Sequence, residues 1–282
     1  MGVWHALAMS DRVSITVDNG IADVRLNRPD KLNALDQAMF QGIVDAGEGL
    51  KGDPGVRVVV LSGEGRGFCA GLDFGSFQAM AGSEPAPAPE RPADGGGLGT
   101  IGDTGGRITH LGQQSAWVWQ ELDVPVIAAV HGPALGGGLQ IALGADLRIV
   151  APDAKLSVLE ARWGLIPDMT GTVLLPRLVG LDVAKELTLT GRMVSGEEAV
   201  QLGLATRVAD DPRAAAFELA ADLVTKSPDA LREGKRLLNL SGTRPLAEQL
   251  HDERVTMGSL IGSANQVEAT TAYFEKRAPK FT

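Results

Sequence analysis

Alternating hydrophobic and polar positions predict a β-hairpin near the start of the chain. The stretch "RVSITVDNGIADVRLN" alternates apolar and polar residues on both sides of Asp18-Asn19-Gly20. Asn-Gly is a favoured hairpin turn because both residues accept a positive φ. After this hairpin, Asp36 stands at the N-cap position of a helix predicted to run through Lys51, with apolar residues near one face.

Two longer apolar runs predict buried strands, and shorter ones predict two more. "VRVVVLSG" and "VPVIAAVHG" are nearly continuous in apolar residues, as is typical of strands covered on both faces. A helix from about Arg107 to Gln120 is expected between them. "ADLRIVA" and "KLSVLE" predict two short strands further along the chain.

The pattern becomes mostly helical beyond Thr170. Ser195 and Glu198 have the spacing of a capping box, and a helical tail from Pro245 to Arg277 would need a partner for its apolar side. Strands that alternate with helices and then give way to helices indicate an α/β layer fold. We expect one core over residues 1–200 that carries the site, and a helical region over residues 201–282. The Pro-, Gly- and Ala-rich stretch from Ser83 to Gly106 is predicted to be a surface loop beside a site.

Composition and charge narrow the function classes. The 282 residues are 44% hydrophobic and 22% charged, which is ordinary for a globular protein. The formal net charge of −9 argues against nucleic acid or an anionic membrane as a partner. No run of about 18 apolar residues occurs, and we expect a cytoplasmic protein. The single cysteine, Cys69, excludes internal disulfides, and the four histidines lack metal-ligand spacing, so no metal is expected.

Two glycine-containing turns follow the two longest apolar runs: "GRGFCAGLDF" and "GPALGGGLQ". Glycines allow close approach to a ligand, and two facing turns could aim two backbone N–H groups at one developing oxyanion. The alternative is that the glycines only allow a helix to pack tightly on a strand. Neither a Rossmann fingerprint after the first strand nor a P-loop motif is present, so those phosphate cradles are missing.

Five motifs then carry a family resemblance. "LNRPDKLNALD", "GFCAGLDF", "PVIAAVHGPALGGGLQIALGADLRI", "GLIPDMTGT" and "FEKRAPKF" together resemble the crotonase superfamily of enoyl-CoA hydratases and isomerases, from about Val13 to Phe281. The resemblance implies an α/β spiral of ββα units with a helical C-terminal region. It also implies homotrimers or dimers of trimers and an acyl-CoA thioester substrate, with coenzyme A as part of the substrate and no separate cofactor.

The resemblance also implies roles for single residues. The two donors to the thioester oxygen fall on the N–H groups of Leu72 and Gly137. Other contacts with the substrate fall on Gln140 and on residues in three further stretches of the chain. In the last of these stretches, Tyr273 and Lys276 would reach coenzyme A of the same or of a neighbouring subunit. The residues in the three stretches are Arg28, Lys31, Leu32, Ala34, Ala70, Gly71, Asp73, Tyr273 and Lys276.

The acid–base set departs from that of the hydratases. They use two glutamates, whereas here the first position is Gln140 and the second is Glu160. An amide cannot exchange a proton at neutral pH. Glu160 and Asp168 match the carboxylate pair of the dienoyl-CoA isomerases, and the simpler enoyl-CoA isomerases need only the carboxylate at the Glu160 position. Double-bond isomerisation is therefore the leading prediction, with hydration and a non-catalytic acyl-CoA-binding scaffold as rivals.

Each candidate also has a simpler interpretation from its residue type alone. Asp168 could cap the helix that starts in "MTGTVLLPRL", and Glu160 could be a solvated carboxylate at a strand end. Cys69 could be a nucleophile, but its type is more often a small buried hydrophobe. Trp163 could line an acyl pocket or fill the core, and His131 is predicted to be structural.

Overall fold

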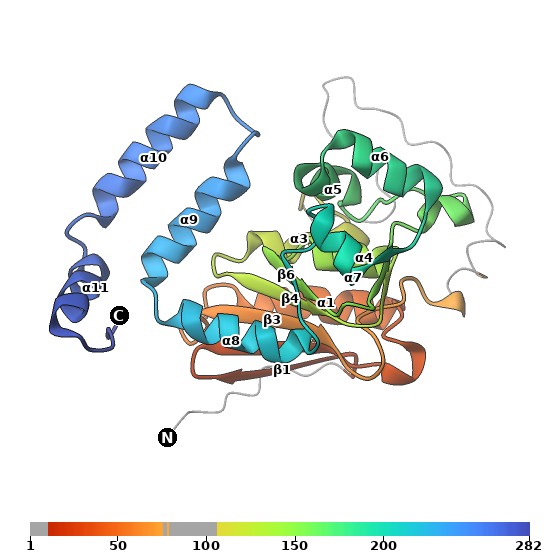
Figure 1. Ribbon diagram of the computed structural model, residues 1–282, viewed down its shortest axis with the longest axis horizontal. Coiled ribbons are helices and arrows are strands. Elements are labelled where there is room, and N and C mark those ends of the chain that lie inside the picture. Colours follow the sequence, from red (N-terminus) through yellow and green to blue (C-terminus); the bar gives the residue numbers. More distant parts are fainter. Residues whose placement is uncertain (1–10, 76–77, 79–105) are drawn as a thin grey trace.

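A six-stranded sheet forms the centre of the molecule (Figure 1), which a computed structural model describes over residues 11–75, 78 and 106–282. Its strand order is β1-β2-β3-β4-β6-β9, and every pair is parallel except β1 with β2. The predicted loop from Ser83 lies outside the described residues except for Gly106. The strands are β1 (Val13–Asp18), β2 (Ile21–Leu26), β3 (Val58–Gly63), β4 (Val126–Val130), β6 (Leu147–Val150) and β9 (Arg207–Val208).

The predicted hairpin between β1 and β2 is confirmed. Asn19 and Gly20 form its turn with φ angles of 50° and 82°, the left-handed region that this turn requires. Val13 pairs with Leu26 at the open end, so the register is set by the two-residue turn.

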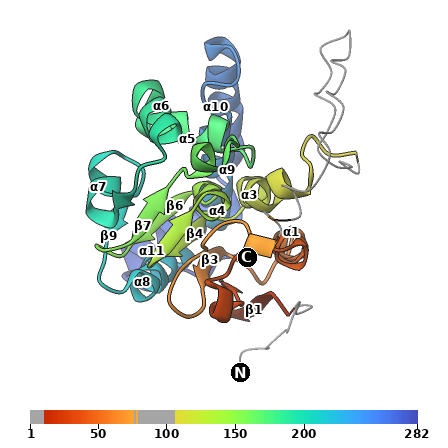
Figure 2. The ribbon, with the colours of Figure 1, turned by 90° about the vertical axis from the view of Figure 1, so that its right-hand side faces the viewer.

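Helices cover both faces of the sheet, as the continuous apolar strands predicted. Val58 and Val60 of β3 face α8 (Pro212–Val224), whereas Val59 and Leu61 point into the larger core on the other face. That core is covered by α1 (Gln37–Leu50), α3 (Leu111–Glu121) and α4 (Gly137–Leu143). Figure 2 shows α8 and the pair α1 and α3 on opposite sides of the strands.

A second, three-stranded sheet positions the two segments that carry the candidate chemistry. It consists of β5 (Pro133–Leu135), β7 (Lys155–Ser157) and β8 (Val194–Ser195). β5 runs into α4, and β7 is followed by the 3₁₀ helix η2 (Glu160–Trp163). β5 was not predicted, because its Pro133 and the following glycines obscure a strand pattern. β7 is also shorter than the predicted "KLSVLE", so Glu160 begins a helical turn and does not end a strand.

One predicted helix start and one predicted capping box need correction. The helix expected from Arg107 begins at Leu111, because His110 is its N-cap. Ser195 caps α7 (Gly196–Gln201) by accepting a hydrogen bond from the N–H of Glu198 at 3.2 Å. The Glu198 carboxylate does not complete the capping box and instead pairs with Arg192 at 2.7 Å. The helices α5 (Gly171–Val179) and α6 (Leu181–Thr190) complete this part of the chain.

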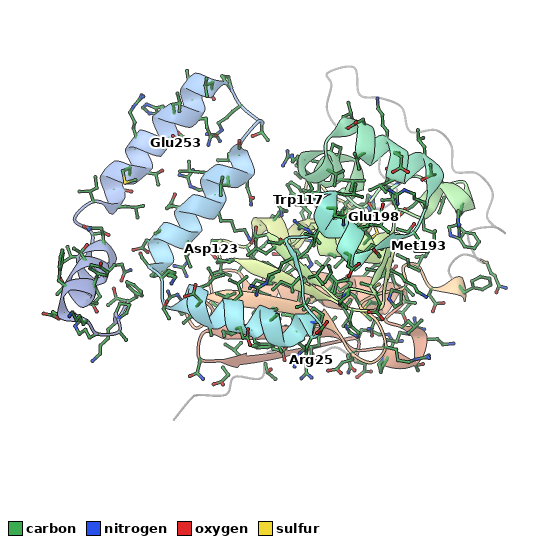
Figure 3. All side chains as sticks on the ribbon, in the orientation of Figure 1. Arg25, Trp117, Asp123, Met193, Glu198 and Glu253 are labelled. Atoms are coloured by element: carbon green, nitrogen blue, oxygen red, sulfur yellow. The ribbon has the colours of Figure 1, made fainter. Side chains whose placement is uncertain are left out.

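The C-terminal helices form an arm beside the core (Figure 1). The predicted tail is two helices, α10 (Leu246–Leu260) and α11 (Ala264–Glu275), and α9 (Pro228–Leu240) precedes them. Gly262, with a φ of 78°, lies in the break between α10 and α11. Thr256 is the one buried residue of α10, and Figure 3 shows side chains of this helix, where Glu253 is labelled, standing clear of the core. α9 therefore covers only part of the apolar side of the C-terminal tail. The division of the chain into a core over residues 1–200 and a helical region over residues 201–282 stays a prediction.

None of the helices in the described ranges is both long and apolar enough to span a membrane.

Candidate active site

A cavity of about 850 Å³ lies where the two glycine turns, η2 and the start of α3 meet. Its wall contains seven of the residues singled out from the sequence. These are Ala70, Gly71, Leu72, Gly137, Glu160, Trp163 and Asp168.

The two glycine turns lie side by side, joined by backbone hydrogen bonds. The N–H of Cys69 donates to the carbonyl of Pro133 at 2.9 Å, and the N–H of Leu135 donates to the carbonyl of Cys69 at 3.0 Å. A Cβ atom added at Gly138 would lie 2.2 Å from the Cys69 oxygen, so no larger residue fits there. Tight packing is therefore one reason for these glycines, and it brings the two turns together at the cavity.

Leu72 and Gly137 both line the cavity. Within the described ranges, the backbone N–H groups of these two residues make no hydrogen bond to another residue. The turns are close here, because a Cβ atom at Gly71 would lie 3.9 Å from the Gly137 nitrogen. Two donors that meet at one ligand oxygen would stabilise a thioester enolate, and this role of Leu72 and Gly137 stays a prediction.

Cys69 is fully buried, and its Sγ donates to the carbonyl of Asn33 at 3.1 Å. Burial raises the pKa of the Cys69 thiol to about 12, so a thiolate nucleophile is disfavoured and the cysteine acts as a small buried hydrophobe. His131 is structural as predicted, since its Nε2 lies 2.9 Å from the carbonyl oxygen of Gly65.

Glu160 is buried, with 8% of its surface exposed, so the interpretation as a solvated carboxylate is wrong. Its Oε1 accepts a hydrogen bond of 2.6 Å from Nε2 of Gln140, whereas its Oε2 is buried without a partner among the described residues. Burial is the main cause that raises the pKa of Glu160, and the nearby negative charge of Asp168 raises it further. A buried carboxylate with one free oxygen and a raised pKa is suited to accept a proton.

Gln140 is 1% exposed and lies behind Glu160, outside the cavity wall. Its Oε1 accepts two hydrogen bonds, from the N–H of Met169 at 2.9 Å and of Gly171 at 3.0 Å. The amide therefore caps the start of α5, where the residue at the N-cap position, Thr170, makes no side-chain cap. The interpretation of Asp168 as the cap of this helix is wrong, because Gln140 fills that role from the neighbouring α4.

Asp168 lies at the cavity wall with 44% of its side chain exposed, and its Oδ2 is 4.0 Å from Nε2 of His110. His110 also lines the cavity, and sequence reasoning missed it. The signal that could have found it is its place directly before the helix of "LGQQSAWVWQ". Trp163 forms part of the cavity wall and is 52% exposed, so it does not fill the core.

The remaining predicted contacts lie outside this cavity. The Arg28 guanidinium pairs with Asp73 at 2.8 Å and donates to the carbonyl of Ala34 at 3.1 Å. Lys31 is exposed beside Leu32, and Tyr273 and Lys276 are exposed at the end of α11. Their contacts with coenzyme A stay predictions.

The structural role of Asn33, within the predicted contact stretch of residues 31–34, is one that sequence reasoning missed. Asn33 is fully buried in a left-handed conformation with a φ of 55°. Its Nδ2 donates to the carbonyls of Glu64, Gly67 and Phe68 at 2.9 to 3.1 Å, which fixes the first glycine turn. The Asn in "DKLNALD" is the signal, because asparagine tolerates this backbone conformation.

The described residues contain no cluster of three or more His, Cys, Asp or Glu side chains that could hold a metal ion. The expectation that the protein uses no metal stays a prediction.

Comparison with known proteins identifies the family of this chain. The family model described as enoyl-CoA hydratase/isomerase matches residues 21–280. The probable enoyl-CoA hydratase of Bacillus subtilis is 34% identical, with 95% of this chain and 98% of that protein covered. The 1,2-epoxyphenylacetyl-CoA isomerase of Escherichia coli is also 34% identical, over 94% of this chain and 96% of that protein. An enoyl-CoA hydratase structure from Bacillus anthracis superposes with a TM-score of 0.82 at 29% identity, covering 96% and 98% of the two chains.

The fold and the paired glycine turns define an acyl-CoA enzyme of the crotonase superfamily. The chain belongs to the enoyl-CoA hydratase/isomerase family. The α/β fold predicted from its motifs is confirmed.

Proposed function

We propose that the protein shifts a carbon–carbon double bond in an acyl-CoA thioester by proton transfer, with Glu160 as the base. The observation that carries this proposal is the hydrogen bonding of Gln140. Its oxygen is used by Met169 and Gly171 and its nitrogen by Glu160, so the amide is turned away from the cavity. Glu160 and Asp168 are the two carboxylates among the described residues of the cavity wall. We therefore assign the proton transfers to these two side chains.

The proposed reaction begins with the thioester oxygen between the N–H groups of Leu72 and Gly137. Oε2 of Glu160 takes a proton from C2 of a 3-enoyl thioester, and the electron pair moves onto the thioester oxygen as an enolate. Return of a proton to C4 places the double bond between C2 and C3 and restores the carbonyl. For a 3,5-dienoyl thioester the proton returns to C6, and the carboxyl group of Asp168 is the candidate donor at this more distant carbon.

Hydration is the second candidate, favoured by the names of relatives such as the probable enoyl-CoA hydratase. In a hydration reaction Glu160 alone would have to activate water, because Gln140 cannot exchange protons. The name of the Escherichia coli relative, an isomerase, supports the first candidate. A scaffold without chemistry is disfavoured, because burying Glu160 with an unpartnered oxygen costs stability that binding alone does not require.

We also propose assembly into homotrimers or dimers of trimers in the cytoplasm. Large apolar side chains exposed on the C-terminal arm support this assembly, because burying them against another chain removes apolar surface from water. They include Leu238, Leu246, Val255, Ile261 and Phe274.

The test supplies the purified protein with a 3-enoyl-CoA, a 3,5-dienoyl-CoA and a trans-2-enoyl-CoA in parallel. We expect the first two to gain conjugated absorbance and the third to react slowly. Glu160→Gln should abolish turnover of all three, whereas Asp168→Asn should impair the dienoyl substrate most. Glu197→Gln, which removes an exposed carboxylate on α7, is the matched control and should be fully active. Fast hydration that is lost in Glu160→Gln and unchanged in Asp168→Asn would contradict the isomerase proposal.

A further inference from the structure

The imidazole of His110 is held in one orientation by the helix that it caps. Its Nδ1 accepts a hydrogen bond from the N–H of Gly112 at 3.1 Å, and the backbone N–H of His110 donates to Oε1 of Gln113 at 3.2 Å. The carbonyl of His110 accepts from the N–H of Gln114 at 2.8 Å. The ring, which is 14% exposed, is therefore fixed at the N-terminus of α3 and at the cavity wall.

The same contacts determine which ring nitrogen carries the proton. Because Nδ1 accepts a hydrogen bond, the neutral ring bears its hydrogen on Nε2. Nε2 is the atom that lies 4.0 Å from Oδ2 of Asp168. A donor thus faces a carboxylate at a distance that a small movement on substrate binding converts into a hydrogen bond, as is common for catalytic contacts in unliganded sites.

The backbone around Asp168 is held in place by hydrogen bonds as well. Its N–H donates to the carbonyl of Ile166 at 2.9 Å, and the next N–H, of Met169, is bound by Gln140. The charged groups that share the cavity wall with His110 are Asp168, Glu160 and Arg107, and Arg107 is paired with Glu48 of α1 at 3.2 Å. Among the described residues of the wall, His110 is the one histidine, and Asp168 is the carboxylate that its Nε2 faces.

We propose that His110 is a positioning residue for Asp168, whose carboxyl group it orients toward the acyl chain through Nε2–H. This inference rests on the proposed function, because it gives Asp168 its place in the second proton transfer. Each of the two carboxylates then has its own positioning residue. Gln140 holds Glu160 from the core side, and His110 holds Asp168 from the side of α3.

The test uses two substitutions that separate the cap from the donor. His110→Asn keeps a side-chain oxygen that can cap α3, but it is too short to reach Asp168. His110→Gln keeps an N–H donor of similar reach. With the 3,5-dienoyl-CoA substrate we expect His110→Asn to lower kcat by roughly tenfold to hundredfold with little change in KM. His110→Gln should recover most of that loss, and His251→Asn on exposed α10 is the matched control with unchanged kcat.

A double-mutant comparison then decides whether His110 acts through Asp168. If it does, adding His110→Asn to Asp168→Asn should lower kcat no further. Losses that multiply, or a His110→Asn variant as active as His251→Asn, would overturn the inference. Failure of the proposed function is recognised separately, because the parent protein would then not convert the 3,5-dienoyl-CoA substrate, whatever residue stands at position 110.

Discussion

Nε2 of Gln140 lies 2.6 Å from Oε1 of Glu160, and both side chains are buried. This contact determines which oxygen of Glu160 is free, because Oε1 is occupied and Oε2 has no partner among the described residues. The same amide holds the start of α5, beside Asp168. One glutamine therefore sets the relative positions of the two carboxylate-bearing segments.

Gln140→Glu places a second carboxylate against Glu160. Two carboxyl groups this close repel each other when both are ionised. One apparent pKa of the pair therefore rises above the pKa of Glu160 in the parent protein. Because Glu160 must be ionised to accept a proton, we expect the acid limb of the kcat/KM profile to move to higher pH. The ratio of hydration to isomerisation should also rise, since the variant has the two glutamates that the resemblance implies for hydratases. Gln41→Glu, at an exposed position of the cavity wall, is the control, and an unshifted profile for Gln140→Glu would contradict the argument.

Glu160→Gln should stabilise the fold at neutral pH while it abolishes activity. Burial raises the folded-state pKa of Glu160 above its unfolded value, so the protonated form is favoured in the fold. The resulting stability is fully present below the unfolded pKa and is lost as pH rises through the folded pKa. We expect a higher Tm than that of the parent at about pH 7 and an equal Tm at about pH 4. Calorimetry over this range, with Glu197→Gln as a control that shows no such trend, checks the sign.

Gly137→Ala tests the donor at the second glycine turn. An added Cβ atom would lie 2.8 Å from Sδ of Met169 and 2.9 Å from Cδ1 of Leu35, both ends of flexible side chains, so the fold should survive. The movement should displace the N–H from the thioester oxygen and lower kcat by about 10²- to 10³-fold. Gly49→Ala on α1 meets no atom within 4 Å and should leave kcat unchanged. A fully active Gly137→Ala variant would exclude this donor.

Lys235→Met should destabilise the attachment of the C-terminal arm. Nζ of Lys235 lies 2.8 Å from Oδ2 of Asp146 and donates to the carbonyls of Trp119 and Val124 at 3.0 and 2.9 Å. Burial lowers the pKa of Lys235 and raises that of Asp146, so each charge depends on the other. Loss of one partner should cost about 3–5 kcal/mol in the free energy of unfolding.

Urea unfolding measures this loss, and Lys226→Met provides its control. Lys226 pairs with Asp222 on the exposed surface, where such a pair contributes under about 1 kcal/mol. Equal losses for the two variants would show that the buried pair has no special role. Adding Asp146→Asn to Lys235→Met should recover part of the loss, because no uncompensated charge then remains buried.

Sequence patterns predicted a turn or a helix start correctly where the residues that stabilise it are neighbours in the chain. The Asn19-Gly20 turn and the Asp36 cap of α1 depend on neighbouring residues alone, and both are present. The predictions failed where a distant group supplies the partner. Glu198 turns from Ser195 to Arg192, and the start of α5 is capped by Gln140 and not by Asp168. Hydrogen bonds of this kind leave no trace in residue spacing.

The sequence by itself determined the layered α/β fold, the two glycine turns and the family, because hydrophobic periodicity and short motifs are properties of adjacent residues. Only the tertiary structure decided that Glu160 is buried with one free oxygen, that Gln140 faces the core and that His110 joins Asp168 at the cavity. Those facts depend on how α3, α4 and η2 pack together. Burial and long-range hydrogen bonds determine which groups can hold a proton, and they exist only once the chain has folded.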